Sequence, residues 1–326
     1  MQTVIRRVGA AIIMGAALAA CGGSSSNNPV TTIAKTSGSS GDAQSATVAT
    51  ALPIQLSVTV TEDGAAMAGA TVAWSTVAGS GTVAPTSGVT NASGIATTTW
   101  TLGTVAGGQT ARATLSGAGG SPVSFTATGT AGVAAALAMT AGDGQSAFPT
   151  DAFGTALAVT VADQFGNGIG SATIDWAVQS GPVTLAAATS STNGSGVATI
   201  GATAGASAGP AVVRATFAGL GGALQDFDLA VTAFPTAAGV TAAFTSYTSD
   251  RNATRDPAVD TIGVGGTISW SGLGSGSHFV RSTGSPSFTT QTVSAATYQF
   301  TFNTIGTYQY DCTIHGSGMT GRVVVR

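Results

Sequence analysis

The sequence contains few charged residues and few residues that carry chemistry. Only 7% of its 326 residues are charged, and Glu62 and Lys35 are its single Glu and Lys. Because Glu and Lys are common in exposed helices, their scarcity argues against a helical protein. The formal net charge is -3 and Lys and Arg form no cluster. This argues against nucleic acid as a partner, because phosphate binding needs concentrated positive charge.

Glycine and small or β-branched residues are abundant instead. The chain contains 47 Gly, and Val, Thr, Ser, Gly and Ala dominate its composition. These residue types favour strands and turns over helices. At roughly 100 to 200 residues per domain, the length and the composition together predict an all-β protein of two or three domains.

The N-terminus has the features of an export signal. Arg6 and Arg7 precede an apolar run over residues 8–20. As a helix, this run would span roughly 20 Å, which is short of the roughly 30 Å hydrocarbon core of a bilayer. A basic segment followed by a short apolar one is typical of a secretory signal peptide. We therefore assign residues 1–20 as a signal peptide.

The segment ends in a short motif, Leu18-Ala19-Ala20-Cys21. This motif resembles the lipobox of bacterial lipoproteins, which implies lipidation of Cys21 and anchoring in a membrane of the cell envelope. Gly22, rather than Asp, after the Cys favours the outer membrane. The alternative is a plain signal peptide with a chance Cys. Residues 21–40 are rich in Ser, Asn and Gly and predict a flexible tether between the lipid and the first domain.

Two later segments repeat each other at an offset of about 102 residues. Thr-Asn-x-Ser-Gly occurs at residues 90–94 and again at residues 192–196. Apolar and polar residues alternate at 56–60 and again at 157–161, which is typical of half-buried strands. Turns that contain Gly or Asn separate the short strands, so each repeat of about 100 residues predicts a β-sandwich.

The repeats resemble bacterial immunoglobulin-like domains of the invasin and intimin type. In the first repeat the resemblance rests on Gly41-Asp42-Ala43-Gln44-Ser45, the Val-Thr-Val and Trp strands, Thr-Asn-x-Ser-Gly, and Gly120-Ser121-Pro122-Val123-Ser124-Phe125-Thr126-Ala127. It implies two domains, over residues 41–131 and 132–235, that form a surface-exposed stalk or spacer and are sometimes adhesive. Trp74 and Trp176 are expected to fill the cores rather than to stack on a ligand. Neither repeat contains His or Cys.

The composition changes after Phe234-Pro235. All four Tyr, both His and Cys312 lie beyond this point. Because residues 307–312 alternate, Tyr308, Tyr310 and Cys312 are expected on one inward face. We expect strands at 267–270, at 297–302 and at 307–312, a further strand that begins at His278, a loop over 313–321 and a final strand at 322–325.

The last fifty residues contain a set of possible metal ligands. Cys312, His315 and Met319 form C-x2-H-x3-M, and His278 lies further upstream. Two imidazoles, a thiolate and a weak thioether suit a copper ion that exchanges one electron, because they are acceptable to both Cu(II) and Cu(I). Zinc is an alternative, although structural zinc sites rarely use a thioether. Taken singly, Cys312 and Met319 could be core residues and His315 a loop residue.

This region also resembles the cupredoxins, the plastocyanin-like blue-copper domains. The resemblance implies a Greek-key β-sandwich over residues 238–326 that holds one type 1 copper. It makes His278, Cys312 and His315 the equatorial ligands and Met319 the axial ligand. The residues that carry it are Val264-Gly265-Gly266-Thr267-Ile268-Ser269-Trp270, Ser277-His278-Phe279-Val280, Tyr298-Gln299-Phe300-Thr301-Phe302 and the segment from Gly306 to Gly321.

The chain departs from the cupredoxin pattern at two places. Three residues separate His315 from Met319, where family members carry two or four, which leaves the axial bond and the reduction potential open. Phe279 follows the first His, where a polar residue often supports the thiolate. Hydrogen-bonding support of the ligands must therefore come from elsewhere in the chain or be absent.

These features lead to one main functional expectation and two alternatives. The main expectation is an exported, lipid-anchored and non-enzymatic electron-transfer protein, with His315 as the electron route to an unknown redox partner protein and the repeats as spacers. The first alternative is a cell-surface structural or adhesive protein that binds a surface partner through its repeats, with copper bound or stored. The weaker second alternative is a small copper-dependent enzyme that borrows its second metal from a partner.

Overall fold

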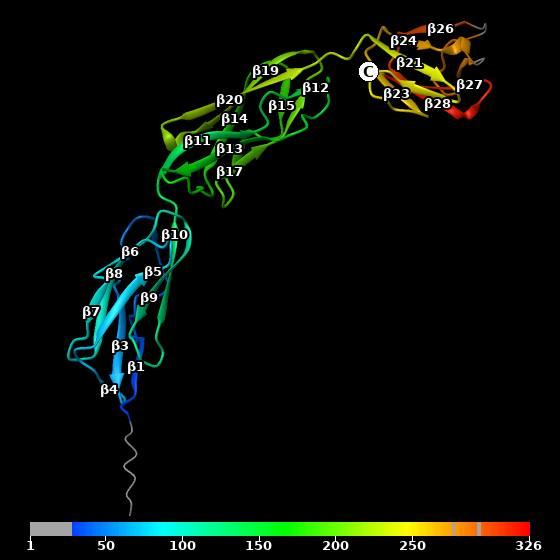
Figure 1. Ribbon diagram of the computed structural model, residues 1–326. Helices are drawn as coiled ribbons and strands as arrows, with labels where there is room; N and C mark the ends of the chain where they lie inside the picture. The colour runs from blue at the N-terminus through cyan, green and yellow to red at the C-terminus, as the bar shows by residue number, and fades with distance from the viewer. Residues whose placement is uncertain (1–27, 276–277, 292–294) are drawn as a thin grey trace, which may run out of the picture. The chain divides into compact units, whose positions relative to one another are not determined.

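The computed structural model describes residues 28–275, 278–291 and 295–326. These residues form strands throughout, with two short 3-10 helices, η1 (Ala218–Leu220) and η2 (Leu273–Ser275) (Figure 1). The prediction of an all-β protein is confirmed. Among the described residues, no helix is long and apolar enough to cross a membrane. The expected signal peptide over residues 1–20 and the expected lipidation site, Cys21, lie outside the described residues.

The chain forms two compact units. The first contains the described residues up to Gly103 together with Gly108–Thr128, and the second contains Thr104–Gly107 together with Gly129–Arg326. Buried hydrophobic side chains form three separate clusters, one in the first unit and two in the second. The residues that the structure describes therefore form three hydrophobic cores, and each lies within a β-sandwich.

The first unit is a sandwich of two sheets. One sheet has the order β1-β3-β8-β6 with β4 beside β3, and the other has the order β2-β10-β9-β5-β7. Burial alternates along the strands, most regularly in β10, so that one face of each sheet is apolar. The strands are β1 (Thr31–Lys35), β2 (Gln44–Thr47), β3 (Leu56–Glu62), β4 (Ala65–Ala66), β5 (Thr71–Thr76), β6 (Thr82–Ala84), β7 (Ser87–Val89), β8 (Ile95–Thr101), β9 (Gly107–Thr114) and β10 (Val123–Thr130).

Strand β1 corrects the prediction of a tether over residues 21–40. Residues 31–35 pair antiparallel with β3, and Ile33 is buried in the core of the first unit. The Ser- and Gly-rich composition suggested a flexible chain, but Thr31, Thr32 and Ile33 are β-branched and suit an edge strand. The ordered part of the first sandwich therefore begins before residue 41.

The second repeat is built in the same way. One sheet has the order β11-β13-β17, a second has the order β12-β20-β19-β14-β16, and β15 pairs with β18. The strands are β11 (Ala134–Ala141), β12 (Ser146–Ala147), β13 (Leu157–Asp163), β14 (Thr173–Ser180), β15 (Val183–Leu185), β16 (Thr189–Ser191), β17 (Val197–Ile200), β18 (Ala202–Ala204), β19 (Gly209–Phe217) and β20 (Ala223–Val231).

Matching side chains of the two repeats make matching hydrogen bonds. The amide of Gln44 donates to the carbonyl oxygens of Gly41 and Ile54, and the amide of Gln145 donates to those of Gly142 and Thr155. The repeat predicted from the sequence is therefore a repeat of structure, down to single side chains.

The two repeats also share the packing of their cores. Trp74 packs on Phe125 with ring centroids 5.9 Å apart, and Trp176 packs on Phe227 at 5.8 Å. Both Trp side chains are buried, in agreement with the prediction that they fill the cores.

The C-terminal sandwich has two four-stranded sheets of mixed direction. Their orders are β22-β21-β24-β26 and β23-β28-β27-β25, and the pairs β21–β24 and β23–β28 are parallel. Both sheets contribute side chains to one buried cluster that is rich in aromatic residues. The strands are β21 (Ala237–Ala243), β22 (Ser246–Ser249), β23 (Ala258–Ile262), β24 (Gly266–Ser271), β25 (Val280–Ser282), β26 (Thr297–Phe302), β27 (Gly306–Cys312) and β28 (Gly316–Val325).

Two strand boundaries in this sandwich differ from the sequence expectation. The last strand begins at Gly316 rather than at Arg322, so Met319 lies within β28 and not in a loop. The start of this strand was predicted too late, because the small residues Gly316, Ser317 and Gly318 suggested a turn. The other strand, β25, begins at Val280, which places His278 just before it.

Candidate metal centre

Strand β27 places the thiol of Cys312 inside the C-terminal sandwich. Tyr308, Tyr310 and Cys312 are all buried, as the alternation of the sequence predicts. Cys312 is fully buried, and its strand pairs with β25 so that Cys312 faces Val280. Because His278 lies two residues before Val280, this pairing brings a histidine from a distant part of the sequence to the end of β27.

The structure brings both histidines to the thiol. His278 Nδ1 lies 3.9 Å from Cys312 Sγ, and His315 Nδ1 lies 3.3 Å from the same sulfur. One ligand atom from each of the three side chains lies within 4.8 Å of the other two. The imidazole ring centroids are 5.1 Å apart. Three of the four residues expected as ligands therefore converge.

These distances fit a metal ion between the three side chains. Metal–nitrogen and metal–sulfur bonds of about 2.0 and 2.3 Å, as in zinc sites, place the two ligand atoms about 3.5–3.7 Å apart at a tetrahedral or trigonal angle. The separations of 3.9 and 3.3 Å lie on either side of this range. The thiolate and imidazole donors are those that copper and zinc prefer.

Burial differs among the three side chains. His278 is 2% exposed and Cys312 is fully buried, whereas His315 is partly exposed. Burial lowers the pKa of His278, and the nearby His315 lowers that pKa further. A neutral imidazole is the form that binds a metal, so the lowered pKa of His278 favours the form that can coordinate.

The fourth expected ligand, Met319, lies in the core of the C-terminal sandwich. Its side chain is fully buried on β28 and belongs to the same hydrophobic cluster as Cys312. Coordination of a metal by the Met319 thioether stays a prediction.

An ion pair beside the candidate ligands was not anticipated from the sequence. Arg281 Nε and Nη2 donate to the two carboxylate oxygens of Asp311 at 2.9 and 2.7 Å. This pair lies one residue along from the Val280–Cys312 pair and links β25 to β27. The sequence offers one weak signal for it, since Asp311 directly precedes a candidate ligand and is a charged residue on a largely buried strand.

A hydrogen bond near His278 was also missed. The hydroxyl of Tyr247 donates to the backbone carbonyl of Phe279 at 2.9 Å. Tyr247 lies 32 residues before Phe279, and no local pattern of the sequence connects these two residues.

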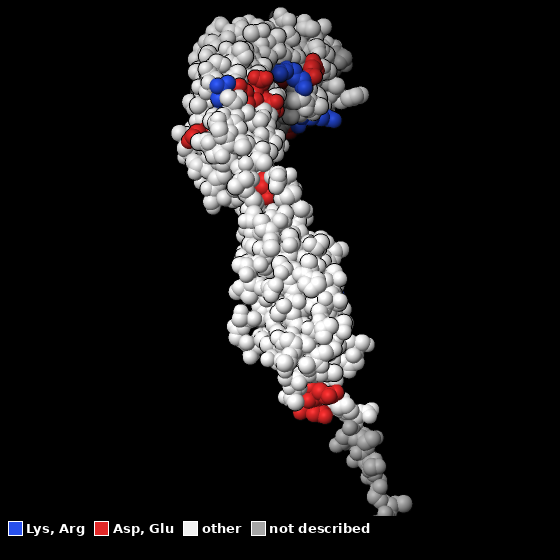
Figure 2. Space-filling view, turned by 90° about the vertical axis from the view of Figure 1, so that its left-hand side faces the viewer, with Lys and Arg blue, Asp and Glu red and all other residues white. Residues whose placement is uncertain are grey.

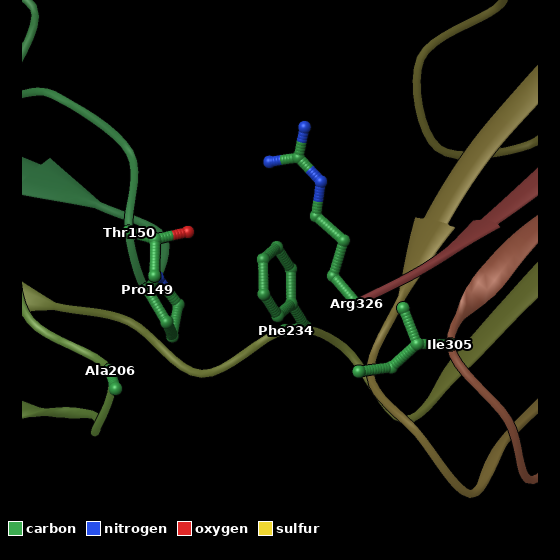
Figure 3. A pocket seen from close by; sticks show the side chains of 6 residues that line it. All are labelled: Pro149, Thr150, Ala206, Phe234, Ile305 and Arg326. Atoms are coloured by element: carbon green, nitrogen blue, oxygen red, sulfur yellow. The ribbon is translucent and has the colours of Figure 1, made fainter.

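The second unit contains a pocket that none of the four expected metal ligands lines. Its cavity volume is about 460 Å³, and Arg326 is its only charged side chain (Figure 3). The residues that line it include no His, Cys, Asp or Glu. They are Pro149, Thr150, Ala206, Phe234, Ile305 and Arg326.

Charged side chains cover little of the surface. On the face of the molecule in Figure 2, most of the described surface is formed by uncharged residues. Among the described residues, His278, Cys312 and His315 form the only group of three or more His, Cys, Asp or Glu side chains close enough together to hold a metal. The C-terminal sandwich therefore contains the candidate site.

Comparisons with known proteins concern the fold. No family model matches the chain, and no curated protein matches it. Three solved structures that resemble it are FdeC, described as an Escherichia coli adhesin, the D0-D1 domain of intimin, and invasin, described as a bacterial integrin-binding protein.

The similarity to these three structures is distant. FdeC is 15% identical, with 91% of this chain and 96% of that chain covered and a TM-score of 0.43. Intimin is 19% identical, with 59% and 95% covered and a TM-score of 0.24. Invasin is 17% identical, with 92% and 60% covered and a TM-score of 0.31. At these identities and TM-scores the matches are reported as similarities alone and carry no conclusion about activity.

Proposed function

We propose that the C-terminal sandwich binds one copper ion and that the protein transfers single electrons. The observation that carries this proposal is the convergence of His278, Cys312 and His315, whose ligand atoms lie within 4.8 Å of one another. These residues are both histidines of the chain and its only thiol beyond Cys21. Met319 is the proposed axial ligand.

The side chains around the candidate site suit this function. Bound copper would supply a one-electron couple at this position. Burial of Cys312 and His278 keeps water away from the thiol, and the pairing of Val280 with Cys312 brings the segment that carries His278 to the end of β27. The partly exposed ring of His315 offers a route for electrons to a redox partner protein. We propose no enzymatic role for the site.

The test is to add Cu(II) to the purified chain and to record its absorption spectrum and voltammogram. A type 1 site gives an intense thiolate-to-copper band and a reversible one-electron wave, and the variant Cys312→Ser loses both. A colourless and redox-silent adduct in the wild-type protein would contradict electron transfer and leave copper storage. Preferential binding of zinc would contradict the copper assignment.

A second candidate function is that of a structural or adhesive protein of the cell surface. The described parts of the two repeats form immunoglobulin-like sandwiches and contain no group of metal-ligating side chains. Two of the structures that resemble the chain are described as an adhesin and as an integrin-binding protein, although their likeness concerns the fold alone. If this second function is correct, the full chain and its Cys312→Ser variant bind cell surfaces equally well.

Location in the cell envelope belongs to both proposals. We infer anchoring through a lipid on Cys21, from the resemblance of residues 18–21 to a lipobox. Mass spectrometry of the membrane-associated protein should find the mature chain starting at an acylated Cys21. Release of the protein by Cys21→Ala would agree with this anchor, whereas continued membrane association would contradict it.

A further inference from the structure

The residue His278 lies just outside the sheet that carries Cys312. His278 precedes β25, so its backbone is not part of the sheet. Its N–H donates to the carbonyl of Leu273 at 3.1 Å. Phe279 follows it and has no polar side-chain atom to support either ligand.

The strand after this segment is well held. Two hydrogen bonds join Val280 to Gln291: the Gln291 backbone N–H donates to the Val280 carbonyl oxygen, and the Val280 N–H donates to Gln291 Oε1. The next residue, Arg281, pairs with Asp311. These contacts fix β25 from Val280 onward, and Phe279 is the link between this fixed strand and His278.

The side chain of Tyr247 forms a hydrogen bond with the backbone of Phe279. Its hydroxyl donates to the Phe279 carbonyl oxygen at 2.9 Å, and its side chain is fully buried. Phe279 is partly exposed, so the hydrogen bond is part-buried, and its loss leaves the carbonyl without the buried hydroxyl that donates to it.

Tyr247 also contacts the strand that carries the thiol. Its ring packs edge-on against Tyr310, with centroids 5.2 Å apart, and Tyr310 lies two residues before Cys312 on the same buried face of β27. One rigid side chain therefore touches the backbone beside His278 and the strand beside Cys312.

We propose that Tyr247 is a positioning residue of the metal centre. It fixes the carbonyl of Phe279 and so sets where the ring of His278 lies relative to the sulfur of Cys312. This inference rests on the proposed copper site. Tyr247 would affect metal binding through the position of His278 and not as a ligand.

Tyr247→Phe tests the proposal because it removes only the hydroxyl. The chain offers a matched control in Tyr308→Phe. Tyr308 is also buried, and its hydroxyl donates to the carbonyl of Thr304 at 2.9 Å, at the end of β27 away from Cys312. Both variants lose one hydrogen bond from a phenol to a backbone carbonyl, so a general loss of stability affects both alike.

The first measurement is copper affinity, by chelator competition, together with the absorption and electron paramagnetic resonance spectra. Loss of a group that orients a ligand typically weakens metal binding about 10- to 100-fold. We expect Tyr247→Phe to weaken Cu(II) binding at least about 10-fold and to shift the thiolate-to-copper band, and Tyr308→Phe to change neither. Equal affinities and spectra in the two variants would overturn the proposal.

The second measurement uses the metal-free protein. Amide hydrogen exchange at His278 and Val280, followed by nuclear magnetic resonance, should be faster in Tyr247→Phe than in Tyr308→Phe. If the wild-type protein binds no copper, the proposed function fails, and the exchange rates still decide whether Tyr247 holds His278. Equal exchange in the two variants would then overturn the positioning role.

Discussion

The two immunoglobulin-like repeats differ at the buried Trp that they share. Trp176 Nε1 donates to Ser190 Oγ at 2.8 Å, whereas Trp74 Nε1 has no hydrogen-bond partner among the described residues. Gly88 occupies the position in the first repeat that Ser190 occupies in the second, opposite Val72 and Ile174 respectively. The backbone of the sandwich is thus repeated, but the pairing of its buried polar atoms is not.

The C-terminal sandwich differs from both repeats in what its core contains. The cores of the repeats are built from aliphatic residues with Trp and Phe, whereas the C-terminal cluster contains Cys312, with His278 buried beside its thiol. The repeats bury single polar groups such as the Trp176 indole N–H, whereas the C-terminal sandwich buries an imidazole and a thiol side by side, and each buried polar group needs a partner. We therefore expect changes of packing and polar pairing to alter the stability of the repeats. At the metal centre we expect changes in the position of the ligands to alter metal binding.

The largest effect is expected at a glycine that the repeats have in common. Gly94 and Gly196 have φ values of +72° and +79°, and a Cβ would lie 2.4 Å from the Val60 carbonyl oxygen and 2.3 Å from that of Val161. Gly196→Ala should lower the free energy of unfolding of the second repeat by at least about 1–3 kcal/mol, from backbone strain alone. Hydrogen-exchange mass spectrometry during denaturation, with peptides from each repeat, measures the change.

Gly194→Ala is the control for this prediction. A Cβ added at Gly194 would meet only open space, and the first repeat already carries Ala92 at the matching position. Gly194→Ala should leave the unfolding of the second repeat unchanged. If Gly196→Ala is equally neutral, the turn is not held as the structure describes.

The next effect removes the difference between the two Trp residues. Ser190→Ala leaves Trp176 Nε1 without its partner, as Trp74 Nε1 is in the first repeat. A buried donor left unpaired costs about 1–3 kcal/mol, so the second repeat should lose stability by that amount. The same exchange measurement applies, with the exposed neighbour Ser191→Ala as control. Equal losses in both variants would mean that the Trp176 hydrogen bond contributes nothing.

Much of the fold could be predicted because its signals are local. Alternation along single strands indicated the all-β class, and the match of residues 90–94 with 192–196 indicated the repeat. Strand β1 was missed because its pairing with β3 depends on residues that lie well beyond it in the chain, which a local composition does not encode. The unequal pairing of Trp74 and Trp176 likewise depends on a residue across the sheet.

The residues of the candidate site also differ in whether a local pattern of the sequence reveals them. Cys312 and His315 are neighbours in sequence, and His278 could be added because the chain has only two histidines. Tyr247 and the Arg281–Asp311 pair could not be predicted, because they reach the site from other strands. The sequence therefore identifies the atoms that could touch a metal better than it identifies the atoms that hold them.

A second difference between the repeats is the burial of an aspartate. Asp63 and Asp163 each accept a hydrogen bond from the first strand region of their own repeat, from Val30 N and Gly132 N, but only Asp163 is buried. Burial raises the pKa of Asp163, yet hydrogen bonds from the Asn167 amide and from three backbone N–H groups outweigh it and lower the pKa to about 2.

This low pKa gives the second repeat an acid-dependent stability. The carboxyl of Asp163 has a pKa below the ordinary value of 3.8, so its contribution is complete above about pH 5 and is lost progressively as the pH falls through the folded pKa of about 2. Asp163→Asn should remove this part of the pH dependence when unfolding is followed between about pH 6 and pH 2. Asp175→Asn, at an exposed position, should retain it. An unchanged profile in Asp163→Asn would contradict the assignment.

The smallest effect is a gain of stability in the first repeat. A Cβ at Gly88 would lie 3.8 Å from Trp74 Nε1 and 3.6 Å from the Thr97 carbonyl oxygen, which is ordinary contact. Gly88→Ser should therefore place a hydroxyl beside the unpaired indole and raise the free energy of unfolding by about 0.5–1.5 kcal/mol, the net value of one hydrogen bond. Gly88→Ala separates this from the effect of restricting the unfolded chain, because it adds the same Cβ without the oxygen. If Ser and Ala stabilise the first repeat equally, the hydroxyl does not pair with Trp74, and the two repeats differ there by more than one side chain.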